Sequence, residues 1–196
     1  MHFRNSERRG GVIFIMDKKT EDLIKAYKDE RFNDCLLIAN NLLKEDKNNL
    51  QVLSYKAGAL KNLGRYKEAI DALNECITLN RDSWYLWVFR GDCYYELGDL
   101  EKACSDYWFS LQFEPQNGAV MDKIARILFL LGDINNALNY INKAVELSES
   151  PEPALVMIIM LRKMGYPNYA KEISNIAIKK FPLKKEEFDY YLIRDL

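Results

Sequence analysis

The sequence predicts an all-α solenoid of about five helix–turn–helix units, closed by a C-terminal capping helix. Three observations support this prediction. Glycines recur at intervals of 34, 34 and 33 residues, at Gly64, Gly98, Gly132 and Gly165. An alanine lies five residues after each glycine, at Ala69, Ala103, Ala137 and Ala170. Apolar residues between these markers follow helical spacing. Self-similarity at a period of this size is typical of stacked two-helix units.

The two recurring residue types have separate structural reasons. A glycine suits the end of a first helix because the terminating residue adopts a left-handed conformation that strains other residues. An alanine allows the backbones of two helices to approach closely. Both are packing residues, so the repeat predicts an architecture and does not identify a partner.

The best copy of the repeat is WYLWVFRGDCYYELGDLEKACSDYWFSLQFEP, from Trp84 to Pro115. It resembles the tetratricopeptide repeat at Trp87, Gly91, Tyr94, Gly98, Ala103, Tyr107 and Pro115. The resemblance extends over about residues 16 to 182 and implies a right-handed solenoid. The first unit is the most eroded, because Glu30 replaces the glycine and Cys35 the alanine. In the last unit, Ser174 stands where a large residue is usual.

In chain order, the predicted units are residues 16–49, 50–83, 84–117, 118–150 and 151–182. Residues 1–15 do not fit the repeat and are expected to form a disordered extension, which suggests Met16 as the true first residue. Helix starts are predicted at Asn49, Ser83, Asn117 and Ser150-Pro151. Residues 183–196 are expected to cap the array, with Phe188, Tyr191 and Leu192 on one helical face.

Composition favours one domain with a continuous core. The chain has 196 residues, of which 48% are hydrophobic, and each unit of a stacked array covers its neighbour. A net charge of -1 and a pI near 6.0 do not favour nucleic acid or an anionic membrane as partner. The longest apolar run, Leu155 to Leu161, is far too short for a membrane span.

The four cysteines, Cys35, Cys76, Cys93 and Cys104, lack the spacing of a metal site. Free cysteine behaves as a small hydrophobe, so we expect reduced core thiols and a cytoplasmic location. No metal or cofactor is predicted.

The sequence offers little for catalysis. His2 is the only histidine and lies in the predicted extension, so a histidine base is not expected. Phosphate-binding glycine motifs are absent from the sequence. A non-catalytic protein is therefore predicted.

The resemblance implies a concave groove lined by the first helix of each unit. Its groove positions are the second, fifth, ninth, twelfth and thirteenth of a unit. They fall here on Gln51, Ser54, Gly58, Lys61 and Asn62; Tyr85, Val88, Asp92, Tyr95 and Glu96; Ala119, Asp122, Arg126, Phe129 and Leu130; and Glu152, Leu155, Ile159, Arg162 and Lys163. We expect partner contacts from Tyr85, Val88, Asp92, Tyr95, Asp122, Arg126 and Phe129.

Two alternatives affect this groove. Phe129, Leu130, Leu155 and Ile159 could instead belong to the core, because inward and groove positions differ by one residue of phase. The C-terminal helix could also fold back and occupy the groove.

One branch of the family grips a carboxylate with lysine, asparagine and arginine at groove positions. Ser54 and Gly58, with Thr20 and Ile24 in the first unit, cannot form that cationic clamp.

Trp108 and Phe109 occupy positions that are polar in neighbouring units. Two adjacent aromatics there indicate a contact site on the convex face, such as a homodimer patch. The alternative is that a neighbouring helix or loop covers them.

The predicted function is a protein–protein interaction scaffold that binds a peptide or helix of an unidentified partner in its groove. The alternatives are a regulatory subunit acting on a partner enzyme and an RNA-binding helical repeat.

Overall fold

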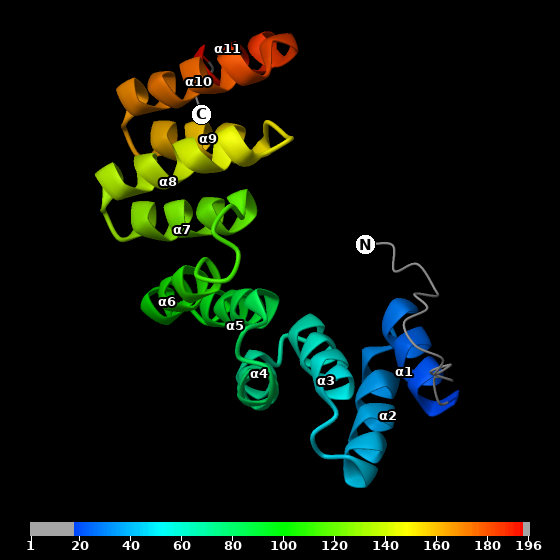
Figure 1. Ribbon diagram of the computed structural model, residues 1–196. Coiled ribbons are helices and arrows are strands. Elements are labelled where there is room, and N and C mark those ends of the chain that lie inside the picture. Colours follow the sequence, from blue (N-terminus) through cyan, green and yellow to red (C-terminus); the bar gives the residue numbers. More distant parts are fainter. Residues whose placement is uncertain (1–17, 194–196) are drawn as a thin grey trace, which may run out of the picture.

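The computed structural model describes residues 18–193 and is all-helical over that range. The expectations for residues 1–15 and for a start at Met16 lie outside it. The helices are α1 (Lys18–Lys28), α2 (Phe32–Glu45), α3 (Leu50–Asn62), α4 (Tyr66–Leu79), α5 (Trp84–Glu96), α6 (Leu100–Ser110), α7 (Gly118–Leu130), α8 (Ile134–Leu147), α9 (Glu152–Lys163), α10 (Pro167–Lys180) and α11 (Lys185–Ile193), with a short 3-10 turn, η1 (Pro182–Lys184), before α11. Successive helix pairs stack into an arc, with α5 on its inner side and α6 outside (Figure 1). The predicted α-solenoid is confirmed.

The turn inside each unit shows why the glycines recur. Gly64, Gly98, Gly132 and Gly165 have φ between 72° and 84°, in the left-handed region. Glu30, at the equivalent place in the first unit, has φ 58°. The eroded unit therefore keeps the turn geometry without the residue that adopts it at least cost.

Side chains cap two of the four helices whose starts were predicted. The side chains of Asn49 and Asn117 accept hydrogen bonds from the backbone N–H of Val52 and Val120 at 3.1 and 3.2 Å. Ser83 occupies the N-cap of α5, but its side chain makes no capping hydrogen bond. Ser83 has the extended backbone conformation of an N-cap residue, without the side-chain hydrogen bond.

The fully buried residues form two clusters connected by partly buried side chains, where one continuous core was expected. The N-terminal core runs from Leu23 to Cys93 and the C-terminal core from Ala103 to Phe188. The boundary falls inside the third unit, between α5 and α6. Tyr94, at the end of α5, is partly buried and packs against both clusters.

Polar and aromatic groups join α5 to α6 at this boundary, which we call the seam. The Arg90 guanidinium donates to both carboxylate oxygens of Asp106, at 2.8 and 2.7 Å, and to Asn74 Oδ1 at 2.7 Å. Hydrogen bonding to Asp106 raises the pKa of Arg90. Trp87 and Phe109 stack nearby, with ring centroids 4.1 Å apart. A buried ion pair thus lies beside the apolar contacts that Val88 and Tyr94 of α5 make with the C-terminal core.

The C-terminal helix closes the end of the stack. α11 packs against α9 and α10, and its Phe188 is fully buried in the C-terminal core. Arg162 of α9 donates to the backbone carbonyl of Tyr191 at 2.8 Å. None of the helices within residues 18–193 has both the length and the apolar character needed to cross a membrane.

Candidate functional site

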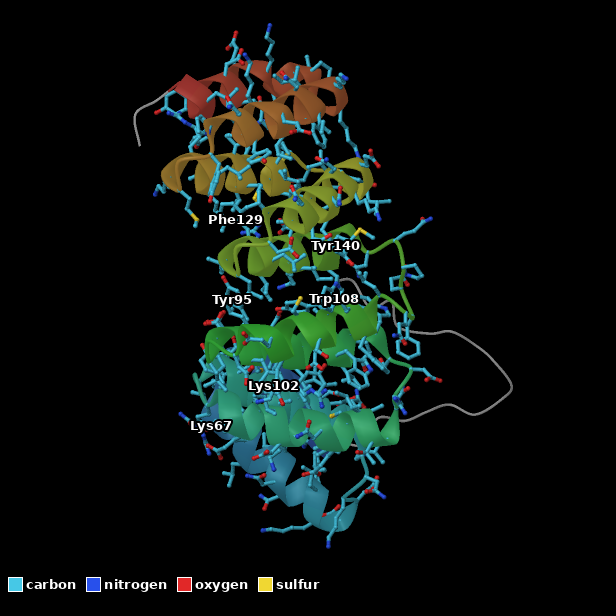
Figure 2. The ribbon with its side chains drawn as sticks, turned by 90° about the vertical axis from the view of Figure 1, so that its left-hand side faces the viewer. Lys67, Tyr95, Lys102, Trp108, Phe129 and Tyr140 are labelled. Carbon is cyan, nitrogen blue, oxygen red and sulfur yellow. The ribbon has the colours of Figure 1, made fainter. Side chains whose placement is uncertain are left out.

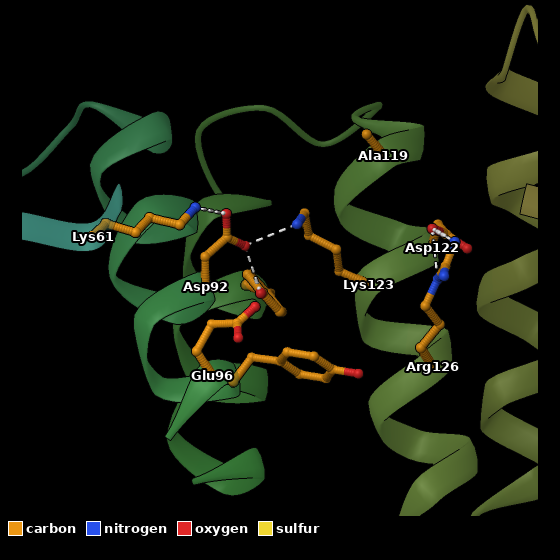
Figure 3. Close-up of a pocket in the computed structure, with 9 residues that line it drawn as sticks. Lys61, Asp92, Glu96, Ala119, Asp122, Lys123 and Arg126 are labelled. Carbon is orange, nitrogen blue, oxygen red and sulfur yellow. Dashed lines mark hydrogen bonds and ion pairs between the residues drawn. The ribbon is translucent and has the colours of Figure 1, made fainter. Parts of the chain in front are cut away.

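A cavity of about 470 Å³ lies between α5 and α7 (Figure 3). Its lining residues are Lys61, Asp92, Tyr95, Glu96, Tyr107, Ala119, Asp122, Lys123 and Arg126. None of them belongs to α11, so the C-terminal helix does not fill this part of the groove. Four of the predicted contact residues, Asp92, Tyr95, Asp122 and Arg126, lie in the lining.

Asp92 is the centre of the site, and lysines reach it from the units on both sides. Lys61 Nζ of α3 lies 3.0 Å from Asp92 Oδ2, and Lys123 Nζ of α7 lies 2.8 Å from Asp92 Oδ1 (Figure 3). This Lys61–Asp92–Lys123 ladder connects three consecutive units across the inner face. Its members are spaced 31 residues apart in sequence.

Tyr107 supplies a third hydrogen bond to Asp92, from its hydroxyl to Oδ1 at 2.7 Å. Gly91 makes this contact possible, because a Cβ there would lie 2.7 Å from the Tyr107 ring. Burial and the Asp92 charge raise the pKa of Tyr107 far above its usual value, so the hydroxyl remains a donor. The glycine and tyrosine of the repeat pattern thus also build the site.

Opposing effects set the ionisation of Asp92. Burial favours the neutral acid, but the Lys123 ammonium, the Tyr107 hydroxyl and the Lys61 charge outweigh it, and the pKa of Asp92 lies below its usual value. Asp92 is therefore a carboxylate at neutral pH.

A second ion pair lies within α7. Arg126 Nη2 is 2.7 Å from Asp122 Oδ2, and Arg126 Nε donates to the same oxygen at 2.9 Å. The other carboxylate oxygen, Asp122 Oδ1, is buried and has no hydrogen-bond partner among the described residues. Figure 3 shows this pair on the side of α7 away from Asp92.

The sequence-predicted residues divide into three groups. Asp92, Tyr95, Asp122 and Arg126 line the cavity, whereas Tyr85 and Val88 do not. Tyr85 is exposed near the start of α5, and Val88 packs against the C-terminal core. Phe129 is only 1% exposed and meets Tyr166 edge to face, with centroids 6.3 Å apart. The groove prediction is wrong for Phe129, which is a core residue.

Trp108 and Phe109 do not form one exposed patch. Phe109 is covered by Trp87 and by the Arg81 guanidinium, which lies 5.3 Å from its ring centroid. Phe109 is therefore partly covered within its own unit, and its role as a convex contact stays a prediction. Trp108 is 45% exposed, and Figure 2 shows it and Tyr95 toward different edges of the stack.

Lys123 and Tyr107 were missed by sequence reasoning. Lys123 lies one residue beyond a groove position, and Tyr107 was read only as a packing residue. The alternation Lys61, Asp92, Lys123 at a constant interval of 31 residues could have identified the ladder. Within residues 18–193, no group of three histidine, cysteine or acidic side chains is arranged to hold a metal ion.

Comparison with known proteins establishes the family. The tetratricopeptide-repeat profile matches residues 51–83, 85–107 and 119–151. The chain belongs to the tetratricopeptide-repeat family. A TPR repeat-containing protein of Methanocaldococcus jannaschii is 27% identical over 153 residues, which cover 74% of this chain and 27% of that protein. The chain thus spans about a quarter of the length of this relative.

Solved structures show the same fold. MamA from Desulfovibrio magneticus aligns with a TM-score of 0.74 at 15% identity, covering 88% of this chain and 97% of that one. The first TPR of Spaghetti, solved with an HSP90 peptide, aligns with a TM-score of 0.56 at 24% identity, covering 58% of this chain and 90% of that one. At these identities the likeness shows the architecture and leaves the ligand open.

Proposed function

We propose that this tetratricopeptide-repeat protein is a non-catalytic scaffold that holds a segment of a partner protein against α5 and α7. The supporting observation is the cavity between these helices. Its lining includes Tyr95, whose side chain is 39% exposed, together with charged residues of α5 and α7. Aromatic side chains that are partly exposed in a concave surface are suited to anchoring a partner. The Spaghetti repeat bound to an HSP90 peptide shows that this fold can hold a peptide.

The cations of this cavity are not free to bind a ligand carboxylate, as those of a cationic clamp are. Lys61 and Lys123 are both within ion-pair distance of Asp92, and Arg126 is paired with Asp122. An incoming carboxylate would have to displace an internal one. We therefore propose a partner segment that packs on Tyr95 and Ala119 and leaves these pairs in place.

Four buried cysteines without a disulfide suit a reducing compartment. Burial raises the pKa of the Cys35, Cys93 and Cys104 thiols to about 11, which disfavours the reactive thiolate. We place the protein in the cytoplasm on this basis.

The test is a cross-linked pull-down from the source cell with wild type, Ala119→Arg and Trp108→Ala. Ala119 is exposed in the cavity wall, so arginine there should block the site without unfolding α7, as circular dichroism can verify. A partner lost only with Ala119→Arg supports the groove. Loss only with Trp108→Ala, or retention by all three proteins, contradicts it.

A further inference from the structure

The charged groups of the cavity are not equally engaged. Each of its three cations, Lys61, Lys123 and Arg126, forms an ion pair with a carboxylate of the cavity. Glu96, by contrast, forms no hydrogen bond or ion pair with any residue in the described range. It is exposed at the end of α5, and its carboxylate is directed toward the space between α5 and α7 (Figure 3). Among the charges of the lining, only that of Glu96 lacks a counterion within residues 18–193, and it is negative.

The side chain next to Glu96 also favours a positively charged ligand group. Tyr95, next to Glu96 in sequence, presents a ring that is 39% exposed. An exposed aromatic face attracts a lysine or arginine side chain, whose aliphatic stem also packs on the ring.

The opposite ligand charge is disfavoured. A carboxylate would meet Glu96 without a counterion and would compete with Asp92 for Lys61 and Lys123. Asp92 is held by three hydrogen bonds at 3.0 Å or less, so this competition is unfavourable.

We propose that the cavity binds a protein segment that places a lysine or arginine against Tyr95 and Glu96, with an adjacent apolar residue over Ala119. The inference depends on the proposed groove function and specifies the chemistry of the ligand. The Lys61–Asp92–Lys123 ladder then shapes the cavity and is not displaced by the partner.

A phage-displayed library of random 12-residue peptides, panned against the full chain, tests this proposal. Selected peptides are labelled with fluorescein, and their affinity is measured by polarisation. We expect lysine or arginine beside an apolar residue in the selected peptides. Glu96→Gln should weaken binding about tenfold, and Glu96→Lys should weaken it further. Glu101→Gln, an exposed glutamate on α6 outside the cavity, is the matched control and should leave affinity unchanged.

Reversing the charges of both the peptide and residue 96 provides the decisive test. A peptide with its basic residue changed to glutamate should bind Glu96→Lys better than wild type. Acidic peptides whose binding requires Lys123 would overturn the basic-ligand proposal and leave the groove function standing. If Ala119→Arg and the Glu96 variants affect no selected peptide, or panning recovers none, the groove function fails as well.

Discussion

The N-terminal core and the C-terminal core are built from the same repeat and meet in the third unit. That unit differs from the units of the C-terminal core in the residues that join its two helices. In the fourth and fifth units, the seventh and twenty-third positions are Ile124 with Tyr140, and Met157 with Ile173. In the third unit the same positions are Arg90 and Asp106. Asp106 is 5% exposed, so an ion pair takes the place of apolar contact. Units that share a motif can therefore differ in the kind of interaction that joins their helices.

The largest expected effect comes from breaking the seam. Arg90→Met leaves the buried Asp106 without its cation, and we expect the free energy of unfolding to fall by about 3–5 kcal/mol. Trp84, Trp87 and Trp108 are the only tryptophans and all lie in the third unit, so fluorescence reports on the seam and circular dichroism on all helices. During urea unfolding of the variant, the fluorescence change should precede the loss of helicity.

The control for this comparison is Arg65→Met. Arg65 pairs with Glu68 at 2.6 Å, but both side chains are about half exposed, at 46% and 55%. Its loss should lower the free energy of unfolding far less than Arg90→Met does, because solvent screens an exposed pair. Equal effects of the two arginine substitutions would show that the seam pair contributes no more than a surface pair.

The ladder across the seam should have the next largest effect. Asp92→Asn should lower the free energy of unfolding by about 2 kcal/mol at pH 7, because charged hydrogen bonds from Lys61, Lys123 and Tyr107 are weakened. The pKa of Asp92 is lowered in the folded protein, so its contribution is complete above the unfolded value of about 4 and is lost as the pH falls through the folded pKa.

The difference between wild type and Asp92→Asn should therefore stay constant from pH 6 to 8 and shrink below about pH 4. Denaturant titrations at several pH values measure it. Glu96→Gln changes the same cavity without removing a hydrogen bond, and its stability should match wild type. A difference for Asp92→Asn that grows on acidification would contradict the assigned direction.

Two turn substitutions compare the first unit with the third. Gly98→Ala places a Cβ where φ is 77° and no atom lies within 4 Å, so the cost is conformational, about 1 kcal/mol. Glu30→Gly should do the reverse and stabilise the N-terminal core, by less than about 1 kcal/mol because glycine also increases the entropy of the unfolded chain. Thermal unfolding of both variants measures the two shifts, and a shift of the same sign would contradict this account.

The smallest effect is expected in the C-terminal core. Ser174 is fully buried, and its hydroxyl has no hydrogen-bond partner among the described residues. Ser174→Ala should raise the free energy of unfolding by up to about 1 kcal/mol. Ser110 is equally buried but donates to the Tyr107 carbonyl at 2.7 Å, so Ser110→Ala should destabilise. Chemical denaturation distinguishes the two serines by sign.

Most of the fold could be predicted because glycine and alanine mark four of the five units. The turn at Glu30 was also located, since the phase of the other units fixes its position. The break between the cores was not foreseen, because a repeat motif treats all units as equivalent. The seventh position is also charged in the second unit, at Lys56, where the N-terminal core is continuous, so the alignment alone does not reveal the break.

The site was only partly predictable. The groove phase placed Asp92, Tyr95, Asp122 and Arg126 in the cavity lining, but it could not separate Phe129 from Leu130. Phe129 is buried and Leu130 is 45% exposed. A shift of one residue along the helix therefore moves a side chain from the core to the surface. The family pattern also could not show that Lys123 turns toward Asp92, since that depends on how far α5 and α7 lie apart.

The register of the ladder limits how this protein can be lengthened. Its 31-residue step is one helical turn shorter than the 34-residue interval between the glycines of the second, third and fourth units, so the ladder moves back by about one turn with each unit. A tandem duplication of the third unit would place one copy of Asp92 beside Lys61 and the other beside Lys123. The facing positions in the duplicated unit would be Phe89 and Tyr95, which cannot replace the missing lysine. Each carboxylate would then retain a single lysine, so duplication is less costly elsewhere in the array than at its centre.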